Sequence, residues 1–161
     1  MSNSNQYASV LRRFGAMIID SVIICIPLYI VSGFMMKDSL SAMSDPTMTP
    51  QSMSDTGSSM LVVYLVFIIL YLLYYAYFES SQSQATFGKR LLKMKVVGKD
   101  GERISFSKGL IRAVGRIVSG IILNIGYLMA FFSDAKQSLH DKMAGTYVVM
   151  TSQKADLNRN V

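Results

Sequence analysis

A small number of ionisable residues lie inside or directly beside long uncharged runs of this 161-residue sequence. Asp20 is an acid within an apolar stretch, and Arg13 precedes it by seven residues, so both lie on one helix face about two turns apart. An acid at membrane depth costs on the order of 3 kcal/mol, so Asp20 should face protein or water and have a partner. This pattern predicts a site that handles a proton or a cation.

Two arginines further along the chain are candidate partners for Asp20. Arg112 and Arg116 have i, i+4 spacing and therefore share one helix face. A direct Arg13–Asp20 bridge is harder, because their backbones are separated by roughly 10 Å along the helix axis. Asn124 adds a hydrogen-bonding group deeper in the same segment. The structural alternative is that the arginines extend to the membrane interface while Asp20 only fixes helix packing.

His140 and Asp141 are adjacent in the C-terminal part of the sequence. Such a pair is more often a local hydrogen-bonding feature than a catalytic one, and no serine or cysteine nucleophile motif or HExxH-type spacing accompanies it. We therefore expect no enzyme, no cofactor and no conventional metal site. Six of the twelve methionines fall between residues 35 and 60, and thioethers are soft Cu(I) ligands; the weak copper candidates are Met43, Met48 and Met53.

The composition indicates that membrane helices position these residues. Hydrophobic residues make up 51% of the chain and charged residues only 16%, against about a quarter in soluble domains. The same hydrophobicity excludes disorder. The net charge of +6 does not indicate a nucleic-acid partner, because the charges lie between apolar runs rather than along a soluble face. The single cysteine, Cys25, excludes a disulfide framework and a cysteine zinc site.

The hydropathy pattern predicts one all-α membrane domain over residues 1–161, with two full transmembrane helices. The first covers 14–36, where the internal acid argues against a cleaved signal peptide. The second covers 60–78, nineteen uncharged residues that span roughly 30 Å as a helix. A third hydrophobic segment, 110–133, is interrupted at Asn124-Ile125-Gly126. It is either one span or a broken or re-entrant helical segment.

The Lys and Arg residues predict the orientation in the cell (inner) membrane. Nine of the sixteen lie in 79–116, whereas 37–59 contains only Lys37. The positive-inside rule therefore places the N-terminus and the basic loop 79–109 in the cytoplasm, and a flexible loop 37–59 outside. The tail 134–161 is also basic and should be cytoplasmic. Three full spans would place this tail outside, so a re-entrant third segment fits better.

The basic loop also predicts a short cytoplasmic β-hairpin. Residues 91–97 and 103–106 show partial apolar/basic alternation, and Lys99-Asp100-Gly101 is a turn signal between them. Cations near a membrane surface gain roughly 1 kcal/mol each from anionic headgroups. We therefore expect lipid headgroups or a partner protein, and no nucleic acid, to bind Lys89, Arg90, Lys93 and Lys95.

Three sequence blocks, in this order, resemble the RDD family of small membrane proteins: residues 13–20 (RFGAMIID), 86–92 (TFGKRLL) and 137–146 (QSLHDKMAGT). The family is named for one arginine and two aspartates, and the matching positions are Arg13, Asp20 and Asp141. The resemblance covers roughly residues 8–150 and implies the fold more than the function. A transport role is usually suggested for the family, with some members linked to cation/proton exchange and others resembling accessory subunits. The Met- and Ser-rich loop 37–59 departs from the family pattern.

Two functions from different classes follow. The first is a small oligomeric transporter that exchanges a cation for a proton at Asp20, with arginines as partners of the aspartate. Because two or three spans are too few to enclose a pathway alone, this function requires a homo-oligomer. The second is a non-transporting accessory or scaffold subunit that docks a membrane partner protein or anionic lipid through the basic loop. The family's suggested role favours the first, whereas the absence of a continuous polar stripe in 60–78 favours the second.

Overall fold

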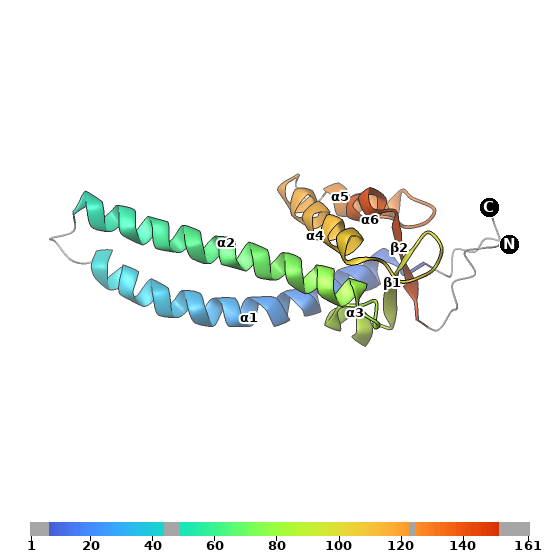
Figure 1. Cartoon of the computed structure of the whole chain (residues 1–161), viewed down its shortest axis with the longest axis horizontal. Helices are drawn as coiled ribbons and strands as arrows, with labels where there is room; N and C mark the ends of the chain where they lie inside the picture. The colour runs from blue at the N-terminus through green and yellow to red at the C-terminus, as the bar shows by residue number, and fades with distance from the viewer. Residues whose placement is uncertain (1–6, 44–48, 123–124, 152–161) are drawn as a thin grey trace. The chain divides into compact units, whose positions relative to one another are not determined.

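The computed structural model of the chain describes residues 7–43, 49–122 and 125–151. These fall into two compact units: unit 1 comprises Met1–Asp20 and Leu72–Val161, and unit 2 comprises Ser21–Tyr71. Two long helices, α1 (Val10–Met43) and α2 (Pro50–Ser80), each contribute residues to both units. Figure 1 labels both helices.

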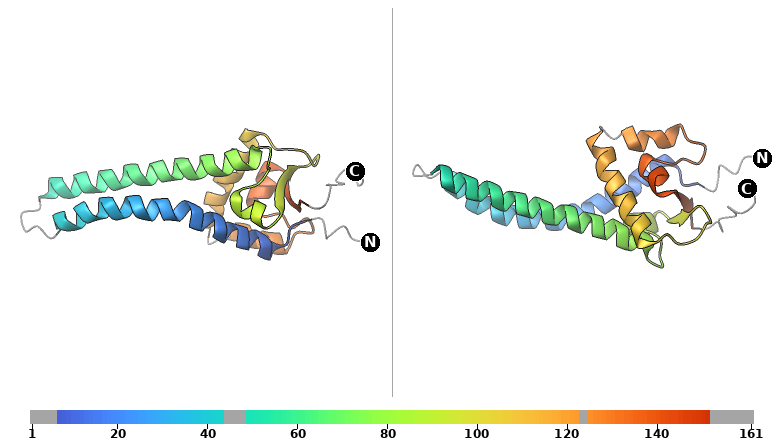
Figure 2. Two further views of the ribbon diagram at one scale, coloured as in Figure 1. Left: turned by 90° about the horizontal axis from the view of Figure 1, so that it is seen from below. Right: turned by 45° about the horizontal axis from the view of Figure 1, so that its top comes forward.

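Unit 2 consists of the α1 and α2 segments between Ser21 and Tyr71, which run side by side in antiparallel directions (Figures 1 and 2). Its large apolar side chains are exposed, as Tyr29 and Phe34 are at 76% each. Two stretches, Val10–Phe34 and Leu61–Ser80, have a mean hydropathy of 2.3, yet only 11% of their most apolar windows is buried. A core helix of a soluble protein would bury this surface, so lipid is the solvent that these helices require.

Both predicted transmembrane helices are present, and both are longer than the sequence pattern indicates. The expected flexible loop 37–59 is wrong over most of its length, because α1 continues to Met43 and α2 begins at Pro50. Adding a residue to an existing helix is far easier than starting one, so helices can extend beyond the apolar stretch. Proline is also well suited to the first position of a helix, where its missing N–H is not needed.

Unit 1 contains the remaining elements, which are short. They are α3 (Phe87–Leu91), β1 (Met94–Gly98), α4 (Phe106–Ile121), α5 (Ile125–Leu128), the 3₁₀ turn η2 (Met129–Phe131), α6 (Leu139–Ala144) and β2 (Thr146–Met150). The expected tail 134–161 therefore contributes a helix and a strand to unit 1 rather than extending away from it.

The predicted β-hairpin is wrong in its second strand. β1 pairs antiparallel with β2, with Val96 opposite Val148, and Tyr7 forms a further bridge with Val149. Residues 103–105 form no strand, because Ser105 instead caps α4 by accepting a hydrogen bond from the Lys108 N–H. β2 has the sequence TYVVM, whose β-branched and aromatic residues fit a strand better than Arg103–Phe106 does.

The apolar core of unit 1 is small and lies where the sheet meets the start of α1. It contains Ala8, Ala16, Met94, Val96, Ile104 and Val148. Much of the remaining buried side-chain volume belongs instead to polar and charged residues, among them Asp20, Glu79, Arg112 and Asp141. Buried charges are tolerated only when they are paired, so their partners determine how unit 1 is built.

Helix α4 carries its two arginines on the buried face and its large apolar residues on the exposed face. Arg112, Arg116 and Ser119 are buried, whereas Val114 and Ile121 are exposed. This is the reverse of a surface helix in water, and it fits a helix whose outer face contacts lipid. The predicted third segment is not one continuous helix, because α4 ends at Ile121 and helical structure resumes at Ile125. Among the described residues only α1 and α2 qualify as membrane-spanning helices.

Candidate functional site

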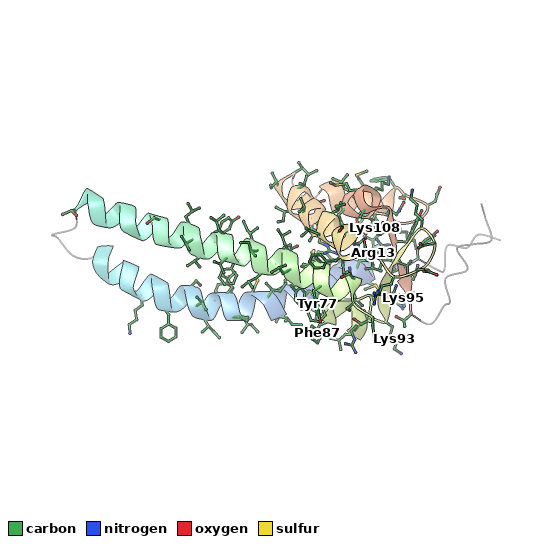
Figure 3. All side chains as sticks on the ribbon, in the orientation of Figure 1. Arg13, Tyr77, Phe87, Lys93, Lys95 and Lys108 are labelled. Carbon is green, nitrogen blue, oxygen red and sulfur yellow. The ribbon has the colours of Figure 1, made fainter. Side chains whose placement is uncertain are left out.

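The side chains of Arg13 and Asp141 form a salt bridge that joins the two ends of the chain. Arg13 lies in the first turn of α1 (Figure 3), and its Nη1 donates to Asp141 Oδ2 at 2.6 Å. Its Nε and Nη2 donate to the carbonyl oxygens of Ala8 and Val148, at 3.2 and 3.3 Å. The planar guanidinium fork can serve several acceptors at once. One arginine therefore ties α1, α6 and β2 together.

Asp141 is fully buried and has a second cationic neighbour. Its Oδ1 lies 2.5 Å from Nη1 of Arg112 in α4. Asp141 also completes a capping box at the start of α6, where the N–H and hydroxyl of Ser138 donate to its Oδ2 at 3.1 and 2.8 Å. Burial alone would raise the pKa of Asp141, but Arg112, Arg13 and the Ser138 hydroxyl hold it well below its ordinary value. Asp141 is therefore a carboxylate.

Glu79 is the second buried carboxylate, and sequence reasoning missed it. Its Oε2 accepts from Arg112 Nε at 2.9 Å, and its Oε1 is ion-paired with Lys89 and Arg116. Three cations therefore converge on one side chain at the end of α2. The sequence pattern places Glu79 at the start of the basic loop. An acid directly after an uncharged run and before a cation-rich segment is the signal that identifies it. We refer to Arg13, Glu79, Lys89, Arg112, Arg116 and Asp141 as the paired cluster.

Lys89 lies inside the paired cluster and not on the surface. Burial lowers its pKa to about 8, although the negative charge of Glu79 opposes this shift. The prediction that Lys89 belongs to an exposed binding surface of the basic loop is therefore wrong, since its side chain is only 9% exposed. The other three predicted residues fit that role better, because Arg90 and Lys93 are exposed and Lys95 is half-buried. Figure 3 labels Lys93 and Lys95.

Asp20 is sheltered as predicted, being 1% exposed, but its partners are neutral donors. Its Oδ2 accepts from the Thr86 hydroxyl at 2.6 Å, and its Oδ1 accepts from the Gly88 N–H at 2.8 Å and the Tyr74 hydroxyl at 3.0 Å. The expected partnership with Arg112 and Arg116 is wrong, because those guanidiniums bind Glu79. Glu79 lies beside these guanidiniums at the end of α2 and supplies the negative charge that pairs with them.

The Asp20 carboxylate caps the N-terminus of helix α3. Thr86 occupies the N-cap position of α3 but makes no side-chain capping bond of its own. Asp20 instead reaches from α1 and accepts the otherwise unpaired N–H of Gly88. The close approach requires glycine, because a Cβ at Gly88 would overlap the carbonyl of Ala16. Asp20 therefore fastens α3 onto α1.

His140 is a buried neutral imidazole within unit 1. Its Nε2 lies 3.0 Å from the Ser138 hydroxyl, and its ring packs against Tyr127. Burial lowers the pKa of His140 well below its ordinary value, so the ring carries no charge at neutral pH. Its Nδ1 is buried without a hydrogen-bond partner among residues 7–43, 49–122 and 125–151.

The remaining predicted sites fall on parts of the chain that the structure does not describe. Asn124 and Met48 lie outside the described residues, as do the side chains of Met43 and Met53. The copper prediction therefore stays a prediction. Within the described ranges no group of three or more His, Cys, Asp or Glu residues is arranged to hold a metal ion.

The four cations of the paired cluster outnumber its two carboxylates. Counting Asp20 as a third carboxylate still leaves four cations against three acids, an excess of one positive charge while Lys89 is protonated. The pairs involve side chains from α1, α2, α3, α4 and α6, so five helices meet at this positive site. Such a site is suited to hold an anion.

Comparison with known proteins agrees with the three sequence blocks. The model of the RDD family matches residues 7–145. The chain is also 36% identical, over 142 residues, to the uncharacterized protein YxaI of Bacillus subtilis (strain 168), which covers 85% of this chain and 93% of that protein. No solved structure matches the chain. The structure brings Arg13 and Asp141 of the arginine–aspartate signature into one salt bridge and gives Asp20 a separate set of partners. The chain is a membrane protein and belongs to the RDD family.

Proposed function

We propose that this protein is a non-enzymatic accessory or scaffold subunit of the cell membrane, and that it docks an acidic partner protein through a cytoplasmic basic surface. The observation that carries this proposal is the bonding of Asp20. A carboxylate that exchanges cations and protons must be open to them, whereas both oxygens of Asp20 are occupied by Tyr74, Thr86 and Gly88. Its position is that of a structural cap.

The basic surface is a shallow groove beside α3 and β1. It is lined by Arg90, Lys93 and Lys95 together with polar side chains that include Gln82 and Thr151. A concave surface with cations, amides and a hydroxyl complements carboxylates on a protein better than it complements a flat layer of headgroups. We name this surface the basic groove.

The proposal places both chain termini in the cytoplasm. The bridge between Tyr7 and Val149 supports it, because residues at the two ends of the described chain are then neighbours and share one side of the membrane. β1, from the cation-rich loop, pairs with β2 and supports the same side for that loop. The positive-inside rule makes that side the cytoplasm.

Affinity purification from cells with and without charge reversal tests the docking surface. The triple variant Arg90→Glu, Lys93→Glu and Lys95→Glu should lose a single co-purifying acidic protein. The matched control reverses Lys99, Arg103 and Lys108, which are also exposed cations of the same loop, and should retain it. A topology reporter at the C-terminus verifies that neither variant inverts in the membrane. Equal loss in both variants would reject the basic groove as the docking site.

Cation/proton exchange is the second candidate, and one observation favours it. Lys89 and Glu79 form a buried acid–base pair in which the lysine pKa is about 8, so this pair can change its protonation near neutral pH. An exchange centre would then involve this pair in an oligomer rather than Asp20. Flux measurements on reconstituted vesicles distinguish the candidates: pH-driven cation flux that disappears in Lys89→Gln supports exchange, and its absence in the wild type supports the scaffold.

A further inference from the structure

Unit 1 contains a cavity of about 310 Å³ whose wall is mainly apolar but carries the cations of the paired cluster. Its charged lining residues are Arg13, Lys89, Arg112, Arg116 and Asp20. The two carboxylates of the cluster, Glu79 and Asp141, are not among the lining residues. The cavity wall therefore presents four cations and one acid.

The acid in the wall does not reverse this positive character, because the four cations still exceed Asp20, Glu79 and Asp141 together by one charge. Both oxygens of Asp20 accept hydrogen bonds from protein groups, two at Oδ1 and one at Oδ2. Cations that line an apolar, poorly solvated space act on a ligand more strongly than they would in water. The wall therefore attracts an anion.

The Arg112 guanidinium has a nitrogen that could donate a hydrogen bond to such a ligand. Arg112 is fully buried, and its Nε and Nη1 are used by Glu79, Asp141 and Thr146. Its Nη2 is buried with no hydrogen-bond partner in the described part of the chain. Leaving a charged donor unpaired in the interior is costly, and such an atom commonly marks a place where a ligand binds.

The rim of the cavity is apolar and open. The lining side chains of Leu11, Phe14, Leu128 and Phe131 are each more than half exposed, at 76%, 56%, 51% and 59%. In a membrane protein such side chains contact acyl chains rather than water. A ligand that satisfies both regions has an anionic head inside the cavity and an apolar tail along the rim.

The size of the cavity limits which part of the ligand it holds. At about 30 Å³ per water molecule, 310 Å³ corresponds to roughly ten waters, which accommodates a compact head but not a whole phospholipid. Arginine forks match the oxygens of a phosphate particularly well. We propose that this cavity binds the phosphate head of an anionic membrane lipid, a phosphomonoester with an acyl tail, while the tail stays in the bilayer. This site is separate from the basic groove.

Native mass spectrometry of the delipidated full-length protein in detergent tests the proposal with three probes: a short-chain phosphatidic acid, the matching phosphatidylcholine, and inorganic phosphate. We expect one bound phosphatidic acid and much weaker binding of the other two. Tight binding of inorganic phosphate, with no gain from the acyl chains, would show a site for a soluble anion and overturn the lipid assignment. Equal binding of both lipids would overturn the role of the cations.

Two variants test whether the lipid binds in the cavity: one removes a charge from the wall, and the other fills space without changing a charge. Lys89→Gln removes one wall cation and should weaken phosphatidic acid binding about tenfold, whereas Lys99→Gln makes the same change on the surface and should have no effect. Ala130→Leu adds apolar volume at the wall without altering any charge, and should also reduce binding. Thermal unfolding verifies that each variant is folded. Unchanged binding in both folded cavity variants would refute the site.

Discussion

Two buried carboxylate sites in unit 1 hold their negative charge by different means. The paired cluster satisfies Glu79 and Asp141 with guanidinium and ammonium groups, whereas Asp20 is satisfied by two hydroxyls and one backbone N–H. All three carboxylates are at most 1% exposed. The difference shows that neighbouring donors, and not burial, decide whether an acid belongs to an electrostatic network or acts as a cap.

The difference also determines what each site loses when its acid becomes an amide. In the paired cluster, removal of a carboxylate leaves several cations buried without compensation, which is the expensive case. At Asp20 the partners are neutral, so the cost is that of hydrogen bonds.

The largest effect is expected for Glu79→Gln. This change leaves Lys89, Arg112 and Arg116 without the carboxylate on which they converge, and should lower the free energy of unfolding by about 3–5 kcal/mol. Thermal unfolding of the detergent-solubilised protein measures this loss. Glu102→Gln, at an exposed acid in the same part of the chain, is the control and should be neutral. A small effect at Glu79 would show that the cations have other partners.

Asp20→Asn should have an intermediate effect. The amide keeps the shape and one acceptor oxygen, so one of the hydrogen bonds from Thr86 and Gly88 is lost and the other is no longer charge-assisted, for an expected loss of about 1–3 kcal/mol. The same unfolding measurement applies, with Asp134→Asn as the exposed control. A loss as large as that of Glu79→Gln would mean that Asp20 balances a buried cation after all, and the comparison between the two sites would fail.

The third effect is confined to alkaline pH and depends on Lys89. Its folded-state pKa of about 8 lies below the ordinary value of 10.5, so between these pH values the unfolded chain binds more protons than the folded chain. The contribution of Lys89 to the free energy of unfolding should therefore rise as the pH increases from about 8 to 10.5, and it should be constant below pH 8. The difference between wild type and Lys89→Gln across this range isolates the contribution. A difference that falls with rising pH would contradict the burial of the charged lysine.

Family membership and the two long apolar helices could be predicted from the sequence, because both are carried by contiguous residues. The shelter of Asp20 also followed from its position in an apolar run. The partners of the strands and of the buried charges could not be predicted, because these pairings join distant parts of the chain. β1 has no sequence feature that selects β2 over residues 103–106. Arg112 and Arg116, the expected partners of Asp20, pair instead with Glu79. Spacing places residues on one helix face, but it does not identify which acid from another helix arrives beside them.

The salt bridge between Arg13 and Asp141 has a consequence for biosynthesis. The two residues are 128 positions apart, and a ribosome adding about 5–20 residues per second needs roughly 6–26 s to make the second after the first. During this interval the Arg13 guanidinium lacks the carboxylate with which it pairs in the folded protein. Unit 1 can therefore be completed only after Asp141 and the strand β2, which pairs with β1, have been synthesised.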